Sequence, residues 1–188
     1  MFITAASAII QQTMTVQNTT QKAIQNSYDL MTIKKALILS SKNDLTYGTV
    51  MPYGVNDLNF HKLPEFVYLK RKNQFGRDYI YCPFSVNQTT LTKNIQLNDS
   101  QTYMVDTANI DHRGINREYV ISSHTSQFHA LGVQAIIISP TPPFSNKTSC
   151  LNVQYDTELQ VFTVEGGRVE VITTNDILIG IWLDLNKW

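Results

Sequence analysis

Residues 3–41 contain neither glycine nor proline, although both residues punctuate the rest of the chain. Because glycine and proline break helices more strongly than any other residue, their absence favours one long helix. Apolar residues recur through the segment at helical spacing. We therefore expect a helix that ends near Ser41. The chain should divide into a helical region, 1–45, and a β-rich domain, 46–188.

The two halves of this helix differ in surface chemistry. Residues 1–21 carry no charged side chain and show no clear polar face, whereas the segment from Lys22 onward is amphipathic. A helix docked along only part of its length leaves an apolar end that needs another partner. The amphipathic half is expected to pack on a sheet through five apolar residues: Ile24, Leu30, Met31, Ile33 and Leu37.

The region after the helix is typical of a small β domain. Residues 47–64 are dense in turn formers and predict an irregular connection. Seven segments with strand-like composition follow: Tyr79–Phe84, Thr102–Val105, Glu118–Ser122, Val133–Ser139, Leu151–Tyr155, Gln160–Val164 and Arg168–Thr173.

Three of these patterns allow finer predictions. The run Ala135–Ile138 indicates a central strand buried on both faces. The apolar stretches on either side of Glu165-Gly166-Gly167 predict a β-hairpin. The last stretch, Ile177–Trp188, predicts an edge strand or a docked tail.

Composition constrains the partners and the compartment. The chain has 15 basic and 15 acidic residues, so its balanced charge gives no electrostatic reason to expect nucleic acid as a partner. Cys82 and Cys150 are the only cysteines. In an oxidising compartment they could form a disulfide, and the alternative is two unrelated buried thiols.

Catalytic and metal-binding patterns are weak. His112, His124 and His129 do not have zinc-ligand spacing, and the sequence contains no Gly-x-Ser-x-Gly elbow or phosphate-binding glycine motif. These observations argue against an enzyme and predict no cofactor. The oxygen-bearing side chains of Asp106, Asn109 and Asp111 form a weak calcium candidate whose alternative is an exposed turn.

The N-terminus predicts neither a signal peptide nor a complete membrane span. Phe2–Ile10 is about nine residues long, against the ~20 that a membrane helix needs. The stretch resembles the second half of a span, so we expect the native chain to have a further segment upstream of Met1.

The order of these pieces resembles the type IV pilin-like family, which includes minor pilins and the pseudopilins of type II secretion. Ala36–Ser41, followed by a Gly/Pro-rich passage, is similar to the helix exit of these proteins. Gln74–Tyr81 is similar to their strand entry, with Gln74 where aspartate is usual. Leu131–Pro140 is similar to the strand that ends Ser-Pro-Gly in pseudopilins, with Thr141 in place of the glycine.

The resemblance covers roughly residues 1–140, and the leader that marks a prepilin is missing from the sequence. It implies an α+β fold in which a long N-terminal helix packs on a mainly antiparallel sheet, here with extra C-terminal strands. Some pseudopilins bind calcium in a loop of this region, which adds to the candidate above. An outward-facing domain also agrees with a Cys82–Cys150 bridge.

The function that the resemblance implies is non-enzymatic. The chain would be a structural subunit of a type IV pilus or secretion pseudopilus, anchored in the inner membrane before assembly and then periplasmic or at the cell surface. Its partners would be other pilin-like subunits and the assembly machinery. Four apolar residues of the first half would supply the assembly contacts: Ile3, Ile9, Ile10 and Met14. The alternative is a secreted β-rich binding or adhesion module that does not assemble.

Overall fold

The structure is a computed structural model of the whole chain. It describes residues 2–46, 48–57, 60–65, 67, 70–83, 92–96, 102–106, 119–121, 125–128, 132–156 and 161–185.

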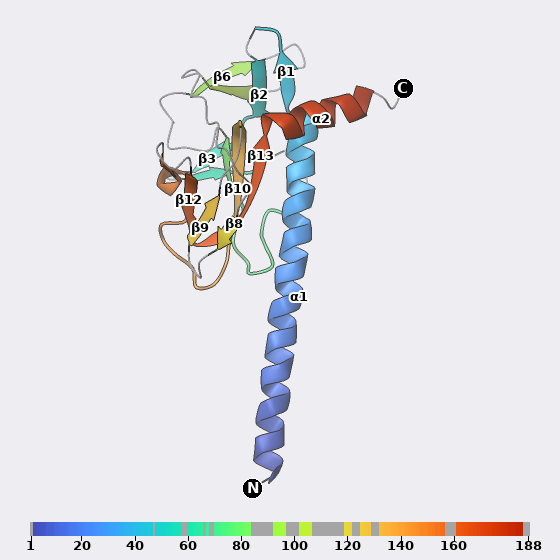
Figure 1. Cartoon of the computed structure of the whole chain (residues 1–188), viewed down its shortest axis with the longest axis vertical. Coiled ribbons are helices and arrows are strands. Elements are labelled where there is room, and N and C mark those ends of the chain that lie inside the picture. Colours follow the sequence, from blue (N-terminus) through green and yellow to red (C-terminus); the bar gives the residue numbers. More distant parts are fainter. Residues whose placement is uncertain are drawn as a thin grey trace.

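The predicted N-terminal helix is confirmed as α1, Phe2–Ser40, a single helix of 39 residues. At 1.5 Å per residue it is about 58 Å long. It ends where the Ser41 N–H and hydroxyl both donate hydrogen bonds to the Ile38 carbonyl, at 3.2 and 2.6 Å. Its C-terminal part lies against the β domain and its N-terminal part projects beyond it (Figure 1).

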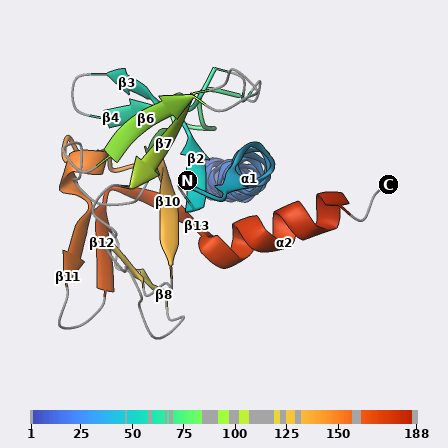
Figure 2. The same ribbon diagram turned by 90° about the horizontal axis from the view of Figure 1, so that it is seen from above.

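In the described part of the chain, the strands form three antiparallel sheets, so the coarse α+β class is confirmed. The first has the order β1-β2-β7-β6, the second β13-β10-β5-β4-β3, and the third β11-β12-β9-β8. Viewed along α1, the sheets lie to one side of the helix (Figure 2). The strand bounds are β1 (Lys42–Asp44), β2 (Gly48–Pro52), β3 (Val55–Asp57), β4 (Phe60–Lys62), β5 (Ile80–Pro83), β6 (Thr92–Gln96), β7 (Thr102–Asp106), β8 (Tyr119–Ile121), β9 (Thr125–Phe128), β10 (Val133–Pro140), β11 (Gln154–Asp156), β12 (Val161–Glu165) and β13 (Gly167–Thr173).

Strand β10 is the centre of the fold, and its predicted burial on both faces is confirmed. It pairs with β5 on one side and β13 on the other. Because successive side chains of a strand point to opposite faces, β10 contributes to two cores. Ala135 and Ile137 belong to the core beneath α1. Ile136 and Ile138 belong to a second core, which contains the disulfide.

The predicted hairpin around Gly166 is wrong. Strand β12 pairs with β9 and β11, whereas β13 pairs with β10 in a different sheet. Only Gly166 separates the two strands, so no two-residue hairpin turn can form between them. Gly166 has a φ of +82°, a value that glycine adopts without strain, and there the chain crosses from the third sheet to the second.

The C-terminal stretch is not an edge strand, and the docked tail that was the alternative is helical. It forms the helix α2, Thr174–Leu185, which crosses α1 and extends past it (Figure 2). Thr173 and Asp176 cap its start: the Asp176 carboxylate accepts hydrogen bonds from the Thr173 N–H and hydroxyl, and the Asp176 N–H donates to the Thr173 hydroxyl. Ile177 is buried beneath α1, and a side chain on Gly180 would overlap with Ile38.

The prediction of an irregular connection over residues 47–64 is also wrong in part. It contains the short strands β2, β3 and β4, of which β2 lies in the first sheet and the other two in the second. Glycine and proline bound these strands, so each is only three to five residues long. A 3-10 turn, η1 (Cys150–Asn152), occupies the start of the segment that was expected to be a strand from Leu151.

Candidate assembly surface

The amphipathic half of α1 is docked through one apolar face. Leu30, Ile33 and Leu37 are almost completely buried and share a core with Tyr79, Ile137 and other residues of the sheet. Spacings of three and four residues place them on one side of the helix. Three of the five residues expected to pack on the sheet therefore lie in the core.

The other two, Ile24 and Met31, do not pack on the sheet, and that expectation is wrong. They are 52% and 51% exposed. Ile24 precedes Ile33 by nine residues, and at 100° per residue this separation places the two side chains about 180° apart. Ile24 and Met31 do have helical spacing from other apolar residues, but they belong to a second apolar face of α1.

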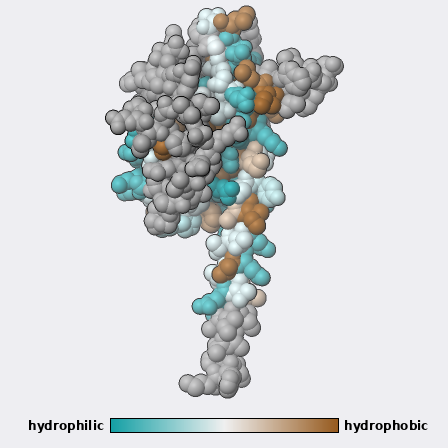
Figure 3. Space-filling model, in the orientation of Figure 1, coloured by the Kyte–Doolittle hydropathy of each residue, from teal (hydrophilic) through white to brown (hydrophobic). Residues whose placement is uncertain are grey.

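This second face, which we call the exposed stripe, consists of Ile24, Tyr28, Met31 and Leu39. Tyr28 and Leu39 are each 63% exposed. The positions follow one another at four, three and eight residues, so they run along the side of α1 that faces away from the core. The exposed Lys35 lies on the same side, between Met31 and Leu39. Apolar side chains are visible along the helix in the space-filling view (Figure 3). Large apolar side chains gathered on one exposed side of a helix mark an interaction site more often than the surface of a protein that acts alone.

The exposed stripe continues into a segment that the domain does not touch. Every residue from 11 to 25 is exposed, including Met14 at 65%. The side chains of Ile3, Ile9 and Ile10 lie outside the described residues, although their backbone is part of α1.

The threonines of this segment use their hydroxyl groups within the helix. Thr15, Thr19 and Thr20 each donate a hydrogen bond to the carbonyl four residues earlier, at 2.8 to 2.9 Å. A hydroxyl that already has a partner costs less to bury than a free one. The Gln/Asn/Thr-rich middle of α1 is therefore better suited to burial against another helix than its composition indicates.

A buried polar network fixes the position of the docked half. The Ser139 hydroxyl on β10 donates to the Asn26 side-chain oxygen at 2.7 Å, and the Asn73 amide donates to the Ser139 hydroxyl at 2.9 Å. The Tyr79 hydroxyl lies 3.4 Å from both Asn26 and Asp29 oxygens. Burial, and then the adjacent Asp29, raise the pKa of the Tyr79 hydroxyl, which therefore stays protonated and acts as a donor.

Sequence reasoning did not identify this network. Its members come from α1, β10 and the segment Asn73–Tyr79, and polar residues so far apart in sequence give no local signal of contact. The network explains why α1 cannot slide along the sheet: a displacement of one turn would leave several buried polar groups without partners.

Charged groups hold the other end of the docked half. Lys34 on α1 forms an ion pair with Asp176 at the start of α2, at 3.2 Å. Glu170 on β13 is near this pair. Burial raises the pKa of the Glu170 carboxyl, while Lys34 and Arg168 act in the opposite direction. The ion pair joins the two helices next to their crossing point.

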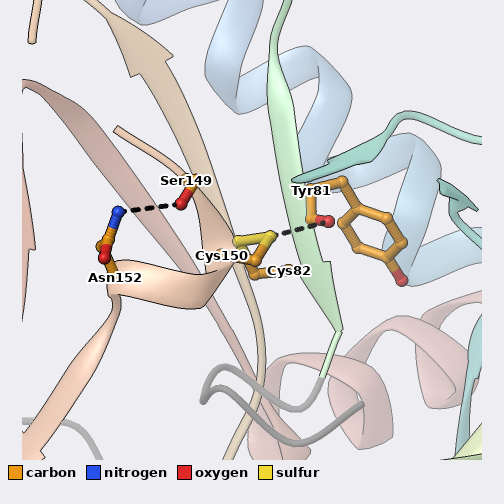
Figure 4. Close-up of a disulfide and its surroundings, with 5 residues drawn as sticks. All are labelled: Tyr81, Cys82, Ser149, Cys150 and Asn152. Atoms are coloured by element: carbon orange, nitrogen blue, oxygen red, sulfur yellow. Dashed lines mark hydrogen bonds between the residues drawn. A yellow bond between two sulfur atoms is a disulfide. The ribbon is translucent and has the colours of Figure 1, made fainter. Parts of the chain in front are cut away.

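Cys82 and Cys150 form a disulfide, with Cα atoms 5.4 Å apart. The bridge joins the end of β5 to η1 (Figure 4). It lies in the second core, on the face of the central sheet opposite α1. Cys150 Sγ lies 3.4 Å from the carbonyl oxygen of Tyr81, the residue next to Cys82. The bridge therefore fixes η1 on the central sheet.

The calcium candidate lies largely outside the described residues. The side chain of Asp106, and the whole of Asn109 and Asp111, lie outside the described residues, as do His112, His124 and His129. Among the residues that are described, no group of three or more histidine, cysteine or acidic side chains could hold a metal ion.

No protein-family model, curated protein or solved structure matches this chain. Within the described residues, no helix combines the length and the apolar character that crossing a membrane requires.

Truncating one residue on each face of α1 tests which face is buried, because only the buried face should contribute strongly to stability. Leu37→Ala removes a fully buried side chain and should lower the free energy of unfolding by about 3 kcal/mol. Met31→Ala, on the exposed stripe, should change it by less than about 0.5 kcal/mol. Urea denaturation of the full chain measures both. Equal losses would show that the assignment of the two faces is wrong.

Proposed function

We propose that this protein is a pilin-like structural subunit that assembles with further copies, or with related subunits, through α1. The observation that carries the proposal is the half-docked helix: residues 11–25 are exposed on all sides, and the exposed stripe lies opposite the buried face. Most of the stability of a helix in a protein comes from packing, so a long helical segment without contacts to its own domain indicates a partner outside that domain.

The chemistry of the projecting segment favours other α1 helices as that partner. Residues 1–21 carry no charge, so identical helices placed side by side do not repel one another. The threonine hydroxyls are already paired within the helix. Two such helices can therefore approach closely without burying unpaired charges or free hydroxyl donors.

The exposed stripe supplies a driving force of sufficient size. Each of its four side chains is half or more exposed. Removing the remaining surface of one such side chain from water is worth about 1 kcal/mol. Several of these contacts, repeated at every subunit of a filament, would stabilise an assembly whose single interfaces are weak.

The disulfide supports the compartment that this function requires. Disulfides persist in the periplasm and outside the cell, and the Cys82–Cys150 bridge belongs to the domain that would face outward. We propose a periplasmic or cell-surface location, with anchoring in the inner membrane before assembly. The proposed activity is filament assembly or initiation driven by helix burial, without bond chemistry.

Charge placed on the exposed stripe should prevent self-association. In the double variant Ile24→Glu/Met31→Glu, each added carboxylate faces solvent in the monomer, so the fold should persist. In an assembly the same groups would be buried and would repel one another. We expect at least a tenfold loss in association, measured by sedimentation of the full chain across a concentration series and by incorporation into filaments in the host.

The control variant is Leu45→Glu/Leu151→Glu, which places two carboxylates at exposed apolar positions outside α1. It should associate as the unmodified protein does. A chain that stays monomeric, with both double variants behaving identically, would contradict assembly and favour the alternative of a secreted β-rich binding module.

A further inference from the structure

The segment Lys70–Tyr79 forms a tight basic loop on the face of the domain. The Asn73 N–H donates to the Arg77 carbonyl at 2.8 Å, and the Tyr79 N–H donates to the Arg71 carbonyl at 3.1 Å. Gly76, with a φ of +75°, forms the turn. The loop carries four cationic side chains and one carboxylate: Lys70, Arg71, Lys72, Arg77 and Asp78.

A cleft of about 570 Å³ lies between this loop and the segment 140–148. Its volume is in the usual range for a small-molecule site. Cationic, neutral polar and apolar side chains line it, and the residues used below are Lys72, Arg77, Asp78, Phe144, Asn146 and Thr148. The cleft is distinct from the exposed stripe, so its occupant need not be an assembly partner.

The cations of the cleft are available to a ligand. Within the described part of the chain, neither Lys72 nor Arg77 forms an ion pair. The Arg77 guanidinium lies over the Phe144 ring, 4.5 Å from its centroid. Stacking of this kind restricts the guanidinium to one plane and leaves its N–H groups free to bind a carboxylate. Asp78 is the single carboxylate of the lining, so the cleft has an excess of positive charge.

The cleft also offers neutral hydrogen-bonding groups. The Thr148 hydroxyl oxygen is buried and has no hydrogen-bond partner among the described residues. Because this hydroxyl has no hydrogen bond to lose, a rotation of the Thr148 side chain could turn it toward a ligand hydroxyl in the cleft at little cost. The exposed Asn146 amide lies in the same lining and can both donate and accept.

We propose that this cleft binds an acidic saccharide, a sugar that carries a carboxylate. The carboxylate would pair with Arg77 and Lys72, and the sugar hydroxyls would bond to Thr148 and Asn146. A simple anion uses only the cations, and a neutral sugar uses only the amide and hydroxyl groups. The combination of both in one cleft is what selects an acidic sugar.

The test is calorimetric titration of the full chain with a glucuronate-containing disaccharide, a neutral glucose disaccharide and sodium acetate. We expect saturable binding of the acidic disaccharide, at least tenfold tighter than that of either other probe. Arg77→Gln should weaken it about tenfold or more, because a charged hydrogen bond is lost. Lys70→Gln removes the same charge from the same loop but lies outside the cleft, and it should change affinity less than threefold.

Arg77 is exposed, so Arg77→Gln should fold normally, and circular dichroism checks this. Three outcomes would overturn the proposal: no binding of the acidic disaccharide, equal binding of acetate, or equal losses in Arg77→Gln and Lys70→Gln. The last result would indicate a diffuse basic surface instead of a site. None of these measurements depends on self-association, so the proposed function is tested separately.

Discussion

Replacing Cys82 and Cys150 together with alanine is expected to lower the free energy of unfolding by about 4 kcal/mol. The bridge joins residues 68 positions apart, and closing a loop of this length removes much of the freedom of the unfolded chain. Alanine is preferred to serine because both sites lie in the second core, where an unpaired hydroxyl would add its own penalty.

Urea denaturation with and without a reducing agent measures this loss. The reductant should destabilise the unmodified protein to nearly the level of the double variant and should leave the variant unchanged. If the unmodified protein and the variant have the same midpoint under oxidising conditions, the bridge does not contribute to stability and the compartment argument loses its support.

Asn73→Ala is expected to lower the free energy of unfolding by about 3 kcal/mol, a large loss for one polar residue. The buried Asn73 side chain makes four hydrogen bonds. Its amide donates to the Ser139 hydroxyl and the Pro140 carbonyl, and its oxygen accepts from the N–H groups of Phe75 and Arg77. Alanine would remove all four bonds at the junction of the basic loop and β10. The Ser139 hydroxyl would keep its bond to Asn26, but the Pro140 carbonyl and the two N–H groups would each lose a partner.

The control for this prediction is Asn152→Ala. The Asn152 amide donates to the Lys147 carbonyl and the Ser149 hydroxyl, but the residue is exposed and water can replace the lost bonds. Its loss should be below about 1 kcal/mol. If the two variants lose equal stability, the Asn73 bonds do not act as a buried anchor.

Local signals were sufficient to predict the elements that local chemistry determines. The absence of helix breakers predicted α1 to within one residue at each end. The apolar run at Ala135–Ile138 predicted the central strand, because the side chains on both faces of β10 are buried there. The possibility of a Cys82–Cys150 bridge also followed from having only two cysteines.

The wrong predictions share a cause. Contacts between residues far apart in sequence determine which face of a helix is buried and which strands pair. Ile24 and Met31 fit an amphipathic pattern, but only the position of the sheet determines which side of α1 is buried. Gly166-Gly167 has the composition of a hairpin turn, yet β13 pairs with β10 instead. The start of α2 had a local signal, since Thr173 and Asp176 match a helix-capping pattern.

The order of elements along the chain has a consequence for folding. The first 40 residues are made before the surface on which α1 docks, and the part of that surface that comes from β10, β13 and α2 is made last. An isolated helix forms within about a microsecond, whereas pairing distant strands is far slower. During synthesis, the face of α1 that these last elements cover therefore stays exposed. Until these elements are made, only another surface, such as a membrane, a chaperone or another nascent copy, could cover the whole of that face.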